Sequence, residues 1–207
     1  MSEQAIKKIL ITGANGFIGG SLMRYYQNQG QDVVGVDLIG NGDDIVEGDI
    51  SQPDSISQLL TESDVIIHTA ALVSNAMQDS DMWRVNVLAT RNLIQAAKEH
   101  KVRRFVQISS IVAYGNTAEG ELDETYPVHA DGGSYVLTKL ASEHVVLSEQ
   151  ANDDIEVVII RPGDAYGPGS RPWIIAPLEA IAKNQFMLPE KGEGFFRPIY
   201  IDDLVRG

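Results

Sequence analysis

A glycine-rich turn near the N-terminus separates a strand-like run from a helix-like segment, and this arrangement leaves few possible folds. Residues 6–11 are aliphatic apart from two lysines, as in a buried strand, and residues 17–29 have helical apolar spacing closed by Gly30. Further strands are expected at 32–37, 45–46, 65–67, 104–108 and 157–160, and further helices at 53–60, 81–99 and 134–149. This alternation predicts an α/β fold, a doubly wound parallel sheet of the Rossmann type with helices on both faces.

The composition excludes several classes of protein. The 207 residues suffice for a domain with its own core, and the absence of cysteine excludes disulfides and thiolate chemistry. The four histidines lack ligand spacing, so no metal is expected. A net charge of −13 opposes nucleic-acid binding, and no apolar run approaches the ~20 residues that would span a membrane. With a polar stretch at residues 1–8, the expectation is a cytoplasmic protein without nucleic-acid or membrane partners.

The glycines of the first turn have the positions that a dinucleotide-binding loop requires. Gly13 permits the tight turn, Gly16 lets the backbone approach a pyrophosphate, and Gly19 lets the helix pack closely on the strand. The helix N-terminus then offers free N–H groups to phosphates. The spacing is G-x-x-G-x-x-G rather than G-x-G-x-x-G, and a plain tight turn is the alternative. The cofactor-binding residues expected here are Gly13, Asn15, Gly16, Phe17, Ile18 and Gly19.

An acidic residue closes the second strand. Asp37 is near the ~20-residue offset at which a carboxylate accepts hydrogen bonds from the adenosine 2′-hydroxyl. Such a carboxylate repels a 2′-phosphate, and neither the glycine loop nor residues 38–41 contain an arginine or lysine. We therefore predict NAD rather than NADP as the cofactor, and the alternative is a solvated aspartate at a strand end.

A tyrosine, a lysine and a serine have the spacing of an acid–base site. Tyr135 and Lys139 are four apart on an expected helix and so share one face. A nearby ammonium stabilises a phenolate and is expected to bring the pKa of the phenol toward the working range. Ser110 follows a strand at the carboxyl edge of the sheet, where it can hydrogen-bond a carbonyl or alkoxide. The alternative for Tyr135 and Lys139 is a pair on the protein surface.

These motifs together resemble the extended short-chain dehydrogenase/reductases, the epimerase/dehydratase superfamily. The resemblance covers essentially the whole chain. It rests on Thr12-Gly13 with the glycine loop, Ser109-Ser110 before Tyr114-Gly115, Tyr135 with Lys139, and Arg161-Pro162 before Tyr166-Gly167-Pro168.

The resemblance implies a role for each matching residue. Tyr135 would be the general acid/base, Lys139 its electrostatic partner and a ribose ligand, and Ser110 the group that polarises the carbonyl. Asn86 would support the lysine through water, although an ordinary polar residue on a helix surface is the alternative. Around the cofactor, Asp49 would reach the adenine. The remaining cofactor contacts implied are Ile50, Ala70, Ala71 and Pro162.

The expected reaction is hydride transfer between a secondary alcohol or ketone carbon of a small molecule and the nicotinamide. In an epimerase the same oxidation is transient. The sugar 4,6-dehydratases of this family usually have Thr-Asp-Glu where this chain has Ser109-Ser110-Ile111, so dehydration is disfavoured. The alternatives are a nucleotide-sugar epimerase and, from another class, a non-catalytic dinucleotide sensor.

One departure from the family concerns the substrate. Asp164 stands where nucleotide-sugar enzymes of this family usually have an asparagine that contacts the diphosphate. A carboxylate there would face like charge, at a cost of order 1 kcal/mol near a surface. The hypothesis is a substrate without a diphosphate, as for a 3β-hydroxysteroid-dehydrogenase-like enzyme, unless Asp164 points away.

We expect residues 1–162 to form the NAD-binding domain and residues 163–207 to begin a substrate lobe. That region should hold a helix at 173–183, and the family length indicates that the lobe is truncated. Phe195, Phe196 and Arg197 are candidates to border the substrate pocket, although Trp173, Phe195 and Phe196 are more often core residues. Asp202 is expected to cap the last helix. By resemblance, helices 81–99 and 134–149 would pair two copies into a homodimer.

Overall fold

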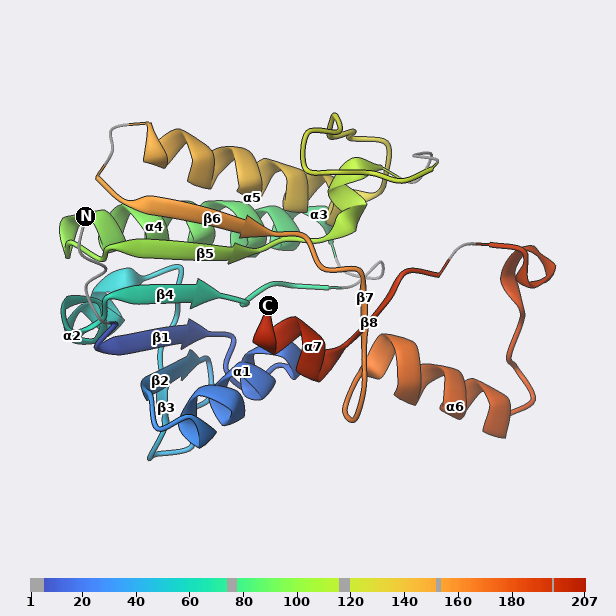
Figure 1. Cartoon of the computed structure of the whole chain (residues 1–207), viewed down its shortest axis with the longest axis horizontal. Coiled ribbons are helices and arrows are strands. Elements are labelled where there is room, and N and C mark those ends of the chain that lie inside the picture. Colours follow the sequence, from blue (N-terminus) through green and yellow to red (C-terminus); the bar gives the residue numbers. More distant parts are fainter. Residues whose placement is uncertain (1–5, 74–77, 116–119, 152–153, 195) are drawn as a thin grey trace. The chain divides into compact units, whose positions relative to one another are not determined.

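The computed structural model describes residues 6–73, 78–115, 120–151, 154–194 and 196–207, and the chain divides into two units at Arg161–Pro162. The first unit contains a single six-stranded sheet in which every paired strand is parallel, in the order β3-β2-β1-β4-β5-β6. Its strands are β1 (Lys8–Thr12), β2 (Asp32–Asp37), β3 (Ile45–Glu47), β4 (Val65–His68), β5 (Arg104–Ile108) and β6 (Glu156–Ile160). This sheet confirms the predicted Rossmann-type fold (Figure 1).

Helices of the first unit cover both faces of its sheet (Figure 1). They are α1 (Phe17–Asn28), α2 (Ser57–Glu62), α3 (Asp79–Trp83), α4 (Thr90–Glu99) and α5 (Ser134–Gln150), with 3₁₀ turns η1 (Pro53–Ile56) and η3 (Ile111–Tyr114). The main core forms where Leu93 of α4 and Val146 of α5 pack over Leu10, Ile66 and Phe105 of three adjacent strands. These buried aliphatic and aromatic side chains supply most of the driving force for the fold.

The helical segment observed around residues 81–99 differs from the predicted helix in two respects. It starts two residues earlier, with α3 at Asp79, and its middle is a π-helical segment η2 (Arg84–Ala89) that leads directly into α4. The segment predicted as a helix from residue 53 begins with the 3₁₀ turn η1 before α2. Apolar periodicity marks a helical segment but does not distinguish α, 3₁₀ and π hydrogen bonding.

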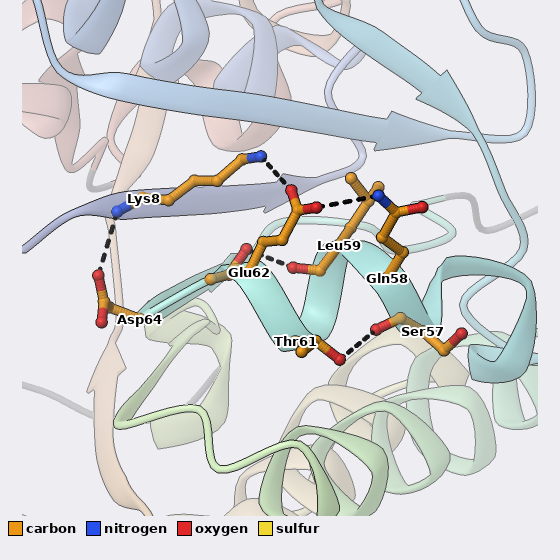
Figure 2. A network of polar contacts seen from close by, with 8 residues as sticks. Lys8, Ser57, Gln58, Leu59, Thr61, Glu62 and Asp64 are labelled. Carbon is orange, nitrogen blue, oxygen red and sulfur yellow. Dashed lines mark hydrogen bonds and ion pairs between the residues drawn. The ribbon is translucent and has the colours of Figure 1, made fainter.

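The start of β1 is tied to α2 and to the start of β4 by polar contacts (Figure 2). The Lys8 ammonium donates to Glu62 Oε2 at 2.7 Å, and Gln58 Nε2 donates to Glu62 Oε1 at 3.0 Å. The backbone N–H of Lys8 donates to Asp64 Oδ2 at 3.1 Å. These contacts hold β4 beside β1 from the end opposite the glycine loop. The strand order changes direction between these two strands, and in such sheets the ligand crevice lies at the carboxyl ends of the strands there.

The second unit contains a small parallel pair, β7 (Asp164–Tyr166) and β8 (Pro198–Tyr200), which the sequence analysis did not predict. Between them are the π segment η4 (Arg171–Ile175), α6 (Ala176–Ala182) and the 3₁₀ turn η5 (Pro189–Gly192), and α7 (Ile201–Arg206) follows. The helix expected at 173–183 thus begins at residue 171 and ends at 182.

Candidate active site

The glycine loop joins β1 to α1, and two of its glycines have no room for a side chain. Gly13 has φ +70°, and a Cβ there would lie 2.7 Å from the backbone of Ala70. A Cβ on Gly19 would collide with the carbonyl oxygen of Gly13. The N–H groups of Gly13 and Ala14 both donate to Val36 O, at 2.9 and 3.2 Å, so the loop is held against β2. Close backbone packing of this kind leaves a cradle that suits a pyrophosphate.

Helix α1 begins at the glycine loop, and no side chain caps its first N–H groups. Its N-cap is Gly16, which has no side chain to cap the first turn, and the first turn contains no acidic residue. Phe17 and Ile18, two of the predicted contacts, form that first turn. The positive end of the helix dipole therefore faces the loop, and no acidic side chain of the first turn neutralises it.

Asp37 lies beside the glycine loop, as its predicted role requires. Its Oδ2 accepts a hydrogen bond from the backbone N–H of Asn15 at 2.9 Å, and its Oδ1 accepts one from Leu38 N at 2.8 Å. Asn15 Nδ2 in turn donates to Ile39 O at 2.7 Å. Each carboxylate oxygen retains a lone pair, so Asp37 can still accept from a ribose hydroxyl.

The other predicted adenine contacts follow β3. The Asp49 carboxylate accepts a hydrogen bond from Ser51 N at 2.8 Å, and Ile50 is buried in the main core. Ala70 and Ala71 follow β4 and are both half-buried, and the N–H of Ala70 lies 3.5 Å from Thr12 Oγ1. Asp49 and Ile50 follow β3, which pairs with β2, and the two alanines follow β4, which pairs with β1, so all four residues lie at the carboxyl edge of the same sheet.

Ser110, Tyr135 and Lys139 come together at the end of β5. Lys139 Nζ donates to Ile108 O at 2.9 Å and lies 6.0 Å from the centroid of the Tyr135 ring. Burial raises the pKa of Tyr135, and a hydrogen bond with the Ser110 side chain only partly offsets that effect. Burial also lowers the pKa of Lys139 to about 8. The structure thus brings the three predicted side chains into one cluster.

The pKa of Tyr135 shifts in the opposite direction to the one expected from the sequence. The nearby lysine was expected to lower the pKa of the phenol, whereas the pKa of Tyr135 is raised. The reason is that desolvation of the phenolate is the largest effect at this half-buried position. At neutral pH the phenol is therefore protonated and can act as a proton donor.

Asn86 is not a surface residue, which excludes the alternative considered for it. It lies in the π segment η2 and is only 2% exposed. Its Oδ1 accepts from Leu72 N at 2.7 Å, and its Nδ2 donates to Leu72 O at 3.0 Å and to Thr138 Oγ1 at 3.1 Å. Asn86 therefore joins the segment after β4 to the turn of α5 between Tyr135 and Lys139.

A buried histidine extends this polar layer under the site. His68 lies between Thr12 Oγ1 (2.6 Å from Nδ1) and Thr90 Oγ1 (2.9 Å from Nε2). The Thr90 hydroxyl donates its proton to Asn86 O at 2.9 Å, so it must accept from Nε2–H. Nδ1 then carries no proton and accepts from Thr12. Burial, with a smaller effect of the nearby Lys139 charge, lowers the pKa of His68 to about 3, consistent with a neutral ring.

A largely buried ion pair, one helical turn along α5 from Lys139, was not predicted from the sequence. Arg161, directly after β6, donates to both carboxylate oxygens of Glu143 in α5, at 2.9 and 2.7 Å. Its third nitrogen donates to Tyr114 OH at 3.0 Å. The signal was present, since Glu143 follows Lys139 by four residues on a helix, but only the fold brings Arg161 to it.

The second unit contains the remaining predicted residues. Pro162 begins this unit. Asp164 Oδ2 accepts a hydrogen bond from the backbone N–H of Arg197 at 3.1 Å, next to the pairing of β7 with β8. One oxygen of this carboxylate therefore has a partner within the unit.

Two expectations about this unit were wrong. Trp173 and Phe196 contact each other, with ring centroids 4.9 Å apart, but both are exposed rather than in a core, and Phe195 lies outside the described residues. The N-cap of α7 is Tyr200 without a side-chain hydrogen bond, so Asp202 does not cap the helix. Acidic residues favour the first turn as well as the cap, and Asp202 occupies that turn.

The part of the chain that the structure describes contains neither a candidate metal site nor a candidate membrane-spanning helix. No group of three or more His, Asp or Glu residues could hold a metal ion among those residues. No helix in the same part of the chain has the length and apolar character to cross a membrane.

The parallel sheet, the glycine loop and the cluster of Ser110, Tyr135 and Lys139 together define an extended short-chain dehydrogenase/reductase. The profile of the NAD dependent epimerase/dehydratase family matches residues 9–207, and the chain belongs to that family.

Curated relatives at about 30% identity differ in their substrates. The low-salt glycan biosynthesis protein Agl12 of Haloferax volcanii is 30% identical over 94% of this chain and 69% of its own length. A sterol-4-alpha-carboxylate 3-dehydrogenase of Candida albicans is 31% identical over 88% and 57%. A UDP-glucose 4-epimerase of Vibrio cholerae is 32% identical over 86% and 58%. This chain thus spans little more than half of the last two relatives.

Solved structures also match almost the whole of this chain, and the chain spans only part of each of them. The UDP-glucuronic acid 4-epimerase of Bacillus cereus, in complex with UDP-glucuronic acid and NAD, matches with a TM-score of 0.84 and 28% identity. The match covers 96% of this chain and 71% of that one.

Proposed function

We propose that this chain binds NAD along the carboxyl edge of its sheet and uses Tyr135 as the acid–base group when a secondary alcohol carbon is oxidised or its ketone reduced. The observation that carries the proposal is the convergence of Ser110, Tyr135 and Lys139 at the end of β5. The glycine loop fits a pyrophosphate because Gly13 and Gly19 leave no room for side chains. Asp37 would hold the adenosine ribose, and its charge favours NAD over NADP.

Each residue of the cluster has a distinct task in this proposal. NAD, when bound, supplies the carbon that accepts or returns the hydride and, in its oxidised form, a positive charge. Tyr135 Oη gives a proton to the substrate oxygen or takes one from it, and Ser110 donates a hydrogen bond to the same oxygen. Lys139 remains largely cationic at neutral pH, since its pKa is about 8, and its charge stabilises the phenolate.

A Tyr135→Phe variant tests the acid–base role. It should lose at least a hundredfold in turnover, the usual contribution of a positioned acid or base, and keep NAD binding within a few-fold. The substrates offered are a UDP-sugar and a 3β-hydroxysteroid, with NADH formation or epimer formation as the readout. Equal turnover by parent and variant would contradict the mechanism. NAD binding without turnover in either would favour the alternative of a non-catalytic dinucleotide sensor.

Two candidate substrate classes have different support. Sugar-nucleotide enzymes dominate the relatives, which favours a nucleotide-sugar epimerase. The carboxylate of Asp164 favours a substrate without a diphosphate, such as a sterol, although its hydrogen bond to Arg197 N shows that part of it has a structural partner. We retain the substrate without a diphosphate as the proposal, because like charge at the diphosphate costs binding energy.

An Asp164→Asn variant separates the candidates, because asparagine keeps an oxygen that can accept from Arg197 N. If Asp164 repels a diphosphate, the variant should bind UDP-glucose about tenfold more tightly in the presence of NAD. Micromolar binding of UDP-glucose by the parent chain itself would contradict our choice of substrate.

We further propose a homodimer formed through the helices that carry Asn86 and Tyr135. Three large apolar side chains on these helices are exposed, which favours a partner surface: Trp83, Leu88 and Leu147. Analytical ultracentrifugation should give a dimer for the parent and a monomer for Leu88→Asp. A monomeric parent at micromolar concentration would contradict the proposal.

A further inference from the structure

Arg161 uses all of its guanidinium nitrogens to join three segments of the first unit. Nε and one terminal nitrogen donate to the two oxygens of Glu143 on α5, and the other terminal nitrogen donates to Tyr114 OH on η3. The guanidinium carbon also lies 4.8 Å from the centroid of the Tyr114 ring. Arg161 itself extends from the end of β6, so one side chain ties α5, η3 and β6 together.

The ion pair is shielded from water, which distinguishes it from an ordinary surface pair. The side chain of Glu143 is 2% exposed and that of Arg161 is 19% exposed. A bidentate pair in such a place restricts the orientation of both partners strongly. Net stability is a weak explanation for a buried pair, because desolvation offsets most of its attraction, whereas geometric specificity is a possible benefit.

The elements joined by Arg161 carry the predicted catalytic residues. Ser110 is the N-cap of η3, with its Oγ accepting from Val112 N at 3.3 Å, and Tyr114 is the last residue of the same turn. On α5, Glu143 lies one turn beyond Lys139 and two turns beyond Tyr135. A shift of η3 against α5 would therefore separate Ser110 from Tyr135.

Glu143 also acts on Lys139 through its charge. Burial is the larger influence on Lys139 and lowers its pKa to about 8, and the Glu143 carboxylate raises it in opposition. Four other charged or titratable groups lie near Lys139 or Glu143. They are Tyr135 on α5, His68 on β4, Tyr114 on η3 and Arg161 after β6. Glu143 differs from these four groups because its carboxylate is negatively charged at neutral pH, and it raises the pKa of Lys139.

We propose that Glu143 and Arg161 are positioning residues for the active site: the pair sets η3 against α5, and Glu143 supplies a negative charge, one helical turn away, that stabilises the Lys139 ammonium. The roles of Ser110, Tyr135 and Lys139 in this inference rest on the proposed function. The ion pair and its effect on Lys139 can be tested without it.

The first experiment measures the Lys139 titration and needs no ligand. Lysine Cε signals of ¹³C-lysine-labelled protein are followed against pH by NMR, and Lys139 is assigned by its absence in Lys139→Met. The parent midpoint should be near pH 8. Glu143→Gln should move it down by about one pH unit, the effect of losing a close opposite charge. An unchanged midpoint would overturn the electrostatic role.

A second Arg–Glu ion pair, between β5 and β6, provides a matched control for the Glu143 variant. Arg104 and Glu156 form another bidentate pair, at 2.9 and 3.0 Å, but their side chains are 38% and 49% exposed. Glu156→Gln should leave the Lys139 midpoint unchanged. If Glu143→Gln fails to fold, the double variant Glu143→Gln/Arg161→Gln leaves no lone buried charge and should also titrate below the parent. A parent-like midpoint in that variant would overturn the proposal.

The second experiment tests positioning with two probes, NAD and ADP. ADP lacks the nicotinamide riboside that Lys139 is proposed to hold. Arg161→Lys keeps the charge but loses the bidentate fork, so it should weaken NAD binding about tenfold and leave ADP binding within twofold. Arg104→Lys should change neither. Equal weakening of NAD and ADP, or no weakening of either, would overturn the positioning role. If the parent binds neither probe, the proposed function fails, and the Lys139 titration still decides the inference.

Discussion

The carboxylate of Asp37 accepts a hydrogen bond from the backbone N–H of Asn15 at 2.9 Å, so the end of β2 is joined directly to the glycine loop. The same residue that would select the cofactor thus also orders the loop that would hold its phosphates. Cofactor preference and loop geometry are therefore linked in this chain.

Replacing Asp37 should reveal both effects. Asp37→Ala removes a charged acceptor, worth roughly 1.5–3 kcal/mol, and should weaken NAD binding about tenfold to a hundredfold. NADP affinity should fall less, because the repulsion of its 2′-phosphate is removed at the same time. Isothermal titration calorimetry with both cofactors checks this, and an unchanged ratio of the two affinities would exclude Asp37 from the ribose site.

Two glycines with the same positive φ provide a test of the pyrophosphate cradle. Gly13 and Gly30 both have φ +70°, but a Cβ on Gly13 would meet Ala70 at 2.7 Å, whereas nothing lies within 4 Å of one on Gly30. Gly30→Ala should cost about 1–2 kcal/mol of stability, from backbone strain alone, with NAD binding retained. Gly13→Ala should cost more and abolish NAD binding. Similar behaviour of the two variants in urea unfolding and NAD titration would argue against a tight loop.

The sequence predicted the parts of this molecule that depend on local pattern. The strands around residues 9–11 and 65–67, the turn at Gly13 and the shared helix face of Tyr135 and Lys139 all follow from short-range spacing. The contacts of Arg161 span 18 residues to Glu143 and 47 to Tyr114, and no local signal specifies them. The π segment around Asn86 was also missed, because apolar periodicity does not register one extra residue in a helical turn.

His68 should be neutral with its proton on Nε2. Its folded pKa, about 3, lies below the ~6.5 of an unfolded histidine, so the unfolded chain binds more protons between these values. The resulting stability is fully present above pH 6.5 and is lost as the pH falls toward 3, by an amount on the order of 4 kcal/mol. ¹⁵N NMR of the imidazole reports the tautomer, and urea unfolding against pH reports the loss. A proton on Nδ1, or titration near pH 6.5, would contradict the hydrogen-bond assignment.

Asn86 should contribute more to stability than a neighbouring asparagine. Asn86 makes three buried or half-buried hydrogen bonds, whereas Asn92 on α4 makes an exposed one to Ser51 O at 3.2 Å. Asn86→Ala should cost about 2–4 kcal/mol, because it leaves buried partners unsatisfied, and Asn92→Ala less than about 1 kcal/mol. Denaturant unfolding of both variants measures the difference, and equal costs would mean that the bonds of Asn86 add little.

The most direct test of the central claim is the melting temperature of this chain with saturating NAD, NADH or NADP. At a hundred times the Kd, binding adds ~2.7 kcal/mol, and for a protein of this size each kcal/mol shifts the midpoint by roughly 2–4 °C. We predict a rise of about 5–11 °C with NAD and NADH and little or none with NADP. No shift with any dinucleotide would contradict the claim that this chain holds a competent cofactor site.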